Sequence, residues 1–65
     1  MSGYFVANIF RGGNMEFVVY GKQYVTFTPI LKNAWDFKTR ARALQFARAI
    51  EAEYSGIRVV KIETP

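Results

Sequence analysis

Basic side chains at the start of a predicted helix are the best candidates for direct contact with a ligand. Lys38, Arg40 and Arg42 lie close together, and the segment 32–48 holds five of the nine basic residues but only one of the five acidic ones. The whole net charge of +4 therefore arises in this segment. Cations beside a helix N-terminus suit a phosphate or a carboxylate-rich partner. An ordinary solvated surface explains the same charges. The candidate anion or nucleic-acid contacts are Arg11, Lys32, Lys38, Arg40 and Arg42.

The side chains that usually carry catalysis are missing or scattered. The chain has no histidine and no cysteine, which removes the commonest general base, thiol nucleophiles and zinc ligands. Its five carboxylates form no evident pair, and the glycines at 12 and 13 lack the lysine and the following helix of a phosphate loop. We therefore expect no enzymatic activity, no cofactor and no metal. The absence of cysteine also fits a reducing compartment.

Length and composition predict one small domain spanning 1–65. The sequence has 65 residues, of which 51% are hydrophobic, enough for a core but near the lower limit for a fold without disulfides or metal. No apolar run approaches the roughly 20 residues that span a bilayer, and residues 1–4 lack the basic start of a signal peptide. These features predict a soluble, cytoplasmic protein that does not contact a membrane.

The predicted elements form an α+β fold, in which a twisted, mainly antiparallel sheet of three to four strands packs on one helix. Thr39 is a good N-cap for that helix, and Gly56 is placed to end it after Ser55. The sheet order should be third, second, first, fourth, and a right-handed crossover would make the fourth strand parallel to the first. Trp35 and Phe37 should anchor the preceding loop. The strands are expected at Tyr4–Phe10, Met15–Tyr20, Gln23–Thr28 and Ile57–Glu63, and the buried helix stripe at Ala43, Phe46, Ala47, Ile50 and Tyr54.

Predicted hairpin registers leave both sides of the sheet apolar. A two-residue Gly12-Gly13 turn would pair Phe10 with Met15, and a Gly21-Lys22 turn would complete the meander. A single helix covers only one side of a sheet, so the other is either covered by the 28–37 loop or left for a partner or a second copy. A register slip of one residue would exchange the two sides. The candidate partner-binding face comprises Tyr4, Val6, Phe10, Phe17 and Tyr24.

A family resemblance rests on Trp35–Ala43, Phe46–Ala47 and Ile57–Ile62. Their pattern, a Phe-x-Thr-x-x-x-Ala helix start before a Val-rich final strand, is similar to that of many small bacteriophage proteins of unknown function. The layout also resembles the small host RNA polymerase inhibitor of lytic podophages, although that inhibitor is acidic around its helix and this chain is basic there. The resemblance implies a phage-encoded accessory protein that binds and modulates a host factor in the host cytoplasm.

Two functional hypotheses follow, beside a third, a structural or assembly protein whose partner is another phage component, which the sequence does not separate from the first. The first is an interaction protein that docks on a host protein, or forms a homodimer, through the apolar sheet face and the basic helix start. The second is a small nucleic-acid-binding protein that uses the cluster from Lys38 to Arg42. Salt dependence separates them, because phosphate contacts weaken steeply with salt and apolar contacts do not.

Overall fold

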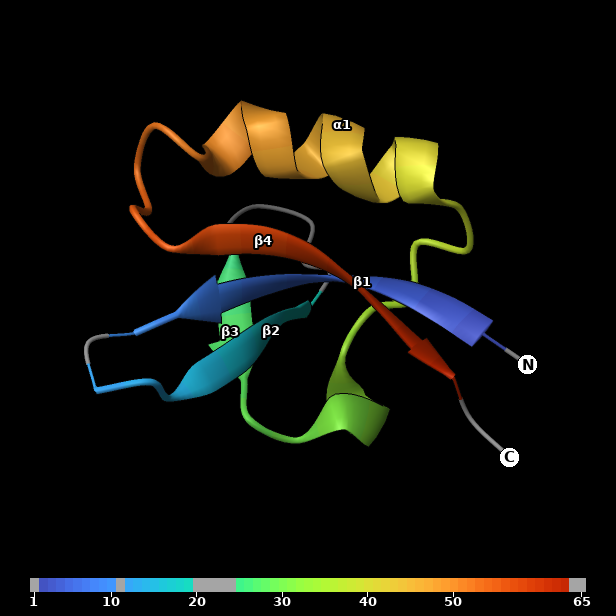
Figure 1. Ribbon diagram of the computed structural model, residues 1–65, viewed down its shortest axis with the longest axis horizontal. Helices are drawn as coiled ribbons and strands as arrows, with labels where there is room; N and C mark the ends of the chain where they lie inside the picture. The colour runs from blue at the N-terminus through green and yellow to red at the C-terminus, as the bar shows by residue number, and fades with distance from the viewer. Residues whose placement is uncertain (1, 11, 20–24, 64–65) are drawn as a thin grey trace.

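The computed structural model describes residues 2–10, 12–19 and 25–63, which form one four-stranded sheet and one α-helix. A short 3-10 turn precedes the helix in the sequence. The predicted α+β architecture is confirmed. No helix in these ranges is long and apolar enough to span a membrane. The elements are β1 (Ser2–Ile9), β2 (Met15–Val19), β3 (Thr26–Thr28), η1 (Leu31–Asn33), α1 (Arg40–Ile50) and β4 (Ile57–Glu63) (Figure 1).

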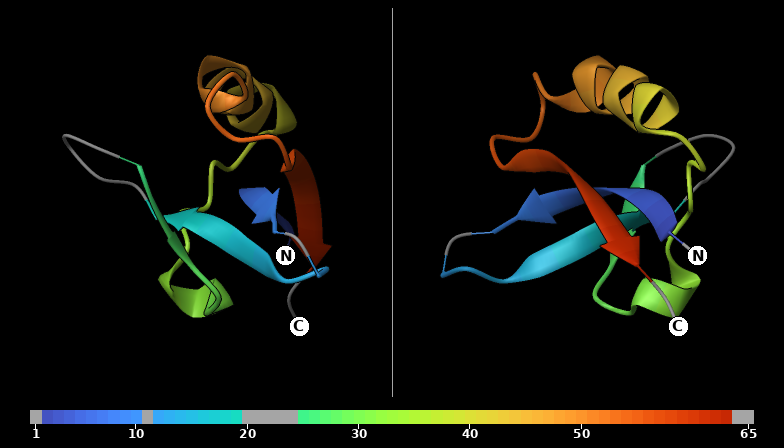
Figure 2. Two further views of the ribbon diagram at one scale, coloured as in Figure 1. Left: turned by 90° about the vertical axis from the view of Figure 1, so that its left-hand side faces the viewer. Right: turned by 45° about the vertical axis from the view of Figure 1, so that its right-hand side comes forward.

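The sheet order β3-β2-β1-β4 is the predicted one, but the direction of β4 is not. Every neighbouring pair is antiparallel, including β1 and β4. The parallel prediction was wrong because it assumed a direct crossover from β3 into the helix. Instead, η1 lies on the side of the sheet opposite α1, and the following segment returns the chain to the N-terminal end of β1 (Figures 1 and 2). The helix therefore runs along β1, and β4 comes back against it.

A gap between β1 and β2 lets the chain change sides. In β1 only the residues from Ala7 to Ile9 pair with β2, and from Ala7 toward the N-terminus of β1 the two strands diverge. Trp35 N–H donates to the Val18 carbonyl of β2 at 3.0 Å, and Phe37 N–H donates to the Tyr4 carbonyl of β1 at 2.8 Å. The segment 35–37 thus takes the place of missing strand pairing, because backbone groups inside a fold need hydrogen-bond partners.

The first hairpin is offset by one residue from the predicted register. Phe10 N–H donates to the Asn14 carbonyl at 2.7 Å, so the loop contains three residues, 11–13, where two were predicted. Gly12 and Gly13 have φ of 96° and 88°, a backbone region that favours glycine. Ala7 consequently pairs with Phe17, and the predicted division of side chains between the two faces was wrong. The predicted Gly21-Lys22 turn lies outside the described residues.

The core lies between α1 and the near side of the sheet. The predicted helix stripe is confirmed, since Ala43, Ala47 and Ile50 are buried and Phe46 and Tyr54 pack against them. The predicted N-cap is also present: Thr39 Oγ1 accepts a hydrogen bond from Arg42 N at 3.2 Å. The helix ends at Ile50, earlier than the predicted Ser55. The strands and the loop contribute Val6, Val18, Ile57 and Phe37 to this core, with Tyr4, Val25, Phe27 and Val59 half-buried at its border.

Gly56 is required by a close approach of two backbones. Its carbonyl accepts from Ile9 N–H at 2.9 Å, and a Cβ at position 56 would collide with the Ile9 carbonyl oxygen. Any side chain there would push β4 away from the end of β1.

We therefore expect Gly56→Ala to lower the free energy of unfolding by about 1–3 kcal/mol, the usual cost of overpacking. Urea denaturation followed by circular dichroism measures this change. Ser55→Ala, at the exposed neighbouring position, is the matched control and should leave stability within about 0.5 kcal/mol. Equal stability of the two variants would contradict the proposed backbone contact.

A candidate binding cleft at the start of the helix

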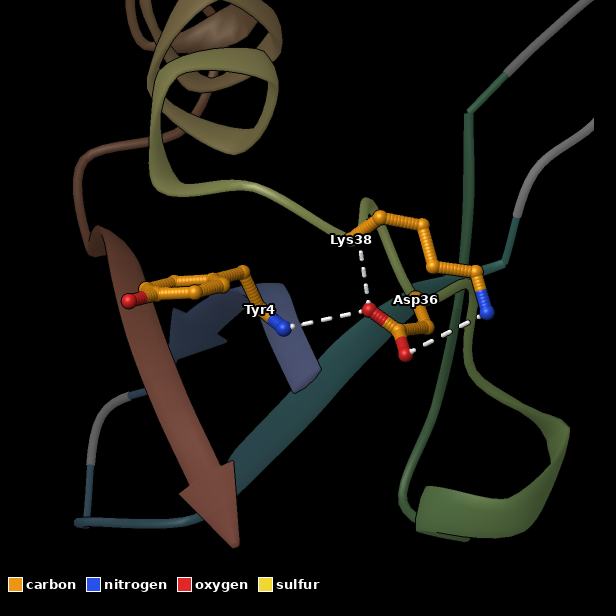
Figure 3. Close-up of polar contacts among 3 residues, drawn as sticks. All are labelled: Tyr4, Asp36 and Lys38. Atoms are coloured by element: carbon orange, nitrogen blue, oxygen red, sulfur yellow. Dashed lines mark hydrogen bonds and ion pairs between the residues drawn. The ribbon is translucent and has the colours of Figure 1, made fainter. Parts of the chain in front are cut away.

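Asp36 fixes the loop that enters α1. Its Oδ1 accepts two backbone hydrogen bonds, from Tyr4 N at 3.1 Å and from Lys38 N at 2.8 Å. Its Oδ2 lies 3.7 Å from Lys38 Nζ (Figure 3). One carboxylate thus ties the edge of β1 facing the gap to the residue just before the helix cap. Gly3 makes room for it, because a Cβ there would lie 2.7 Å from Asp36 Oδ2.

These donors lower the pKa of Asp36 below its ordinary value of 3.8. The largest cause is the backbone N–H of Lys38; the N–H of Tyr4 and the Lys38 charge act in the same direction. Partial desolvation opposes them but does not prevail. The carboxylate is therefore ionised at neutral pH, and its charge is already compensated within the protein.

Lys38 adopts a left-handed backbone conformation, which is uncommon for a residue with a side chain. Its φ is 70°, and the Thr39 N–H donates to the Phe37 carbonyl at 2.8 Å across it, the hydrogen bond of a γ-turn. Such conformations cost of order 1–3 kcal/mol and persist where neighbouring contacts enforce them. Here the hydrogen bonds of Asp36 enforce it.

A cleft of about 430 Å³ opens beside this turn. Its size is within the range of small-molecule sites. Trp35 is 46% exposed, whereas Phe37 is buried. The ring centroids of Phe37 and Phe46 are 5.1 Å apart. An indole, a guanidinium and an ammonium can together hold a flat ring and a phosphate. The lining residues are Trp35, Asp36, Phe37, Lys38 and Arg42.

The cleft brings together two of the five predicted anion contacts, Lys38 and Arg42. Arg40 is not among the lining residues, and two helical positions from Arg42 correspond to about 200° around the axis. Lys32 belongs to η1, on the other side of the sheet (Figure 1). Arg11 lies outside the described residues.

The predicted partner-binding face is not a single surface. Val6 is fully buried beneath the helix, and half-buried Tyr4 borders the same core. Phe17 is on the opposite side, in edge contact with Phe5. Phe10 contacts the Phe27 ring, with centroids 6.2 Å apart. Tyr24 lies outside the described residues. The one-residue register shift separates these residues, because it places Phe17 opposite Ala7 rather than Asn8.

The side of the sheet away from α1 is nevertheless apolar, and we call it the second face. Ile9 and Met15 are paired across the hairpin and are 39% and 40% exposed. Phe5 and Ala7, nearer the N-terminus of β1, are buried. The second face comprises Phe5, Ala7, Ile9, Met15, Phe17, Val60 and Ile62, with Arg58 opposite Ala7 and Thr28 opposite Phe17 on the same side.

Trp35 is the cleft residue that sequence reasoning assigned differently. It was expected to anchor the loop together with Phe37; Phe37 is buried and Trp35 N–H donates to the Val18 carbonyl, but Trp35 is also 46% exposed and lines the cleft. Its position three residues before Lys38 was the available signal, because an aromatic residue beside a basic cluster is typical of nucleic-acid contacts.

Comparison of the chain with protein-family models, with curated proteins and with solved structures gave no match.

The lowered pKa of Asp36 predicts acid sensitivity. Because the folded pKa is below the unfolded value, ionised Asp36 favours the folded state above pH 3.8, and this contribution is lost as the pH falls through the folded pKa. Asp36→Asn keeps an oxygen for Tyr4 N and Lys38 N but removes the charge. We expect its stability to fall less than that of the wild type between pH 5 and pH 2.

The measurement is urea denaturation across that pH range. Asp36→Ala, which removes the acceptor itself, should lose about 1–3 kcal/mol at pH 7 because it leaves Tyr4 N unpaired. If the wild type and Asp36→Asn lost stability in parallel on acidification, Asp36 would not be the responsible group.

Proposed function

We propose that the chain is a non-enzymatic binding protein that holds single-stranded nucleic acid in the Trp35 cleft. The observation that carries this proposal is the exposed indole of Trp35 beside the cations of Lys38 and Arg42 in one cleft. Aromatic stacking contributes about 1–3 kcal/mol per base and tolerates any base. Two adjacent cations supply the phosphate contacts.

The charges of the cleft are available to an anionic ligand. Asp36 would repel a phosphate if its charge were uncompensated, but its Oδ1 accepts from the backbone amides Tyr4 N and Lys38 N, and these two bonds do not involve the Lys38 side chain. The Lys38 side chain is 75% exposed, so it can turn toward a ligand at little cost. Arg42, in the first turn of α1, adds its charge to the positive end of the helix dipole.

The distribution of the other basic residues favours a single strand over a duplex. Arg40 and Lys32 do not extend the cleft into a stripe that could follow two phosphate backbones. A splayed base stacked on Trp35 needs only the local cleft. This favours the second of the two sequence hypotheses, since the residues expected to form the apolar docking face do not lie together.

A protein partner on the second face is the other candidate function. The exposed cross-strand pair of Ile9 and Met15 supports it, because contiguous apolar side chains on a small protein usually mark an interaction site. If the chain is phage-encoded, as its resemblance implies, this partner is a host protein whose activity the binding modulates.

Trp35 is the only tryptophan of the chain, so its fluorescence reports on the cleft. Titration with an eight-nucleotide oligothymidylate should quench this emission. With two phosphate contacts the logarithm of the affinity should fall with a slope of about −1.4 against the logarithm of salt, or about sevenfold between 50 and 200 mM. An abasic oligonucleotide of equal charge should bind much more weakly, because it cannot stack.

Lys38→Gly is the informative variant, because glycine suits the left-handed backbone while removing one cation. It should stay folded, and its salt slope should fall to about −0.7. Arg48→Gln, at an exposed position in the last helical turn, removes equal charge away from the cleft and should bind like the wild type. No quenching by the oligonucleotide, or equal weakening by Lys38→Gly and Arg48→Gln, would refute the cleft as the site.

The second candidate predicts a one-to-one complex with a host protein. This complex should survive 500 mM salt, which is roughly four times the concentration at which exposed charges are already screened. Met15→Lys should abolish it, because an ammonium group would be buried at the contact. Asn14→Lys, an equal charge change at the adjacent exposed residue, should not. Affinity capture from extract of the host bacterium, followed by mass determination of the complex, decides. Retention of the complex by Met15→Lys would exclude the second face.

A further inference from the structure

The outer edge of β4 is a regular strand edge that no described element covers. β4 is the terminal strand of the sheet and pairs with β1 along all seven of its residues, from Ile57 to Glu63 (Figure 2). Such an edge presents a row of backbone donors and acceptors to another chain. We propose that β4 pairs with β4 of a second copy, so that two sheets join into one of eight strands.

The hydrogen bonds of Tyr4 show which amides point outward. Tyr4 N and O bond to Asp36 and Phe37 on the side away from β4, so Tyr4 and its register partner Lys61 form a non-hydrogen-bonded pair. The N–H and C=O of Lys61 therefore point to the open edge. By alternation those of Val59 do the same, and within the described ranges neither residue has a backbone partner there.

The edge is self-complementary in one register. An antiparallel pair centred on Val60 joins Val59 to Lys61 of the second copy, and the reverse, with two hydrogen bonds per pair. At the start of the edge, the Ile57 carbonyl already accepts from Arg58 Nη1 at 2.9 Å. Valine meets valine at the two-fold axis, and no like charges face each other directly. Centring on Lys61 would oppose two ammonium groups, and centring on Val59 would leave part of the strand unpaired.

The helices also fit this arrangement. α1 contacts both β1 and β4, so its axis lies about half a strand spacing inside β4. With strands about 4.8 Å apart, the two helix axes would be about 10 Å apart, a normal helix-packing distance. Figure 1 shows α1 above the first half of β4, whose second half turns away from the helix, so the same two-fold axis places the two helices in antiparallel directions.

The helix flank that would face the second copy carries complementary charges at its two ends. Phe46 and Arg42 face the gap between β1 and β2, where they meet Phe37 and the cleft. The opposite flank begins with Arg40 and ends with Glu51, which lies three full turns later on the same line. In an antiparallel pair of helices, Arg40 of each copy would lie beside Glu51 of the other copy. This charge complementarity favours a second copy of this chain as the occupant of the edge.

The first test removes one outward donor. Lys61→Pro deletes an N–H that the β1–β4 ladder does not use, and Lys61→Ala keeps it as the matched control. In sedimentation equilibrium the wild type and Lys61→Ala should dimerise. Lys61→Pro should raise the dimer dissociation constant by about 30-fold, the equivalent of two lost hydrogen bonds. Circular dichroism checks that each variant is folded.

The second test exchanges charges and does not depend on proline being tolerated. Arg40→Glu and Glu51→Arg should each weaken the dimer severalfold, and the double variant should restore it. Restoration can only be intermolecular, because three turns of helix separate the two residues within one chain. A monomeric wild type up to about 1 mM would overturn the proposal. So would a dimer that ignores Lys61→Pro and the charge reversals but is lost in Met15→Lys.

Discussion

The fold depends on the backbone groups of Tyr4, which β2 does not reach. Beyond Ala7 the two central strands separate, and an unpaired N–H and C=O would remain inside the sheet. Asp36 and Phe37 supply the missing partners, the first through its carboxylate and the second through its N–H. Because this segment is held at the N-terminal end of β1, the helix must start there, and β4 must return antiparallel to β1.

The same requirement creates the cleft. To reach Tyr4 from η1 and then turn into the helix cap, the chain bends sharply at Lys38, which takes a left-handed conformation. Trp35, before the bend, and Arg42, in the first turn of the helix after it, both line the cleft beside this turn. Phe37 holds the bend by inserting into the core against Phe46. The strained residue and the candidate ligand contacts are therefore parts of one structural solution, and the backbone strain at Lys38 is offset by the hydrogen bonds of Asp36.

Sequence patterns predicted what depends on local periodicity and failed where long-range pairing decides. The helix stripe from Ala43 to Ile50 and the Thr39 cap follow from spacing and capping chemistry, which neighbouring residues determine, and the strand order follows from general rules for strand connections. The hairpin register could not be predicted in this way, because a Gly-Gly pair accommodates loops of two or three residues. Only the pairing of Phe10 with Asn14 selects between the two loop lengths. The direction of β4 and the exposure of Trp35 depend on the contact between Asp36 and Tyr4, 32 residues apart in sequence. Nothing in the local pattern around Asp36 distinguishes it from an ordinary surface carboxylate.

The proposed surfaces lie on different flanks and are mutually compatible. The flank of α1 that faces the β1–β2 gap carries the cleft, whereas the flank above β4 carries Arg40 and Glu51. A dimer through β4 therefore leaves both clefts open, related by the two-fold axis and separated by the paired helices. Two weak single-strand sites held on one rigid body bind a strand long enough to reach both far more tightly than either does alone, because the second contact becomes intramolecular. A domain too small to build one extended groove can in this way obtain useful affinity from two short clefts.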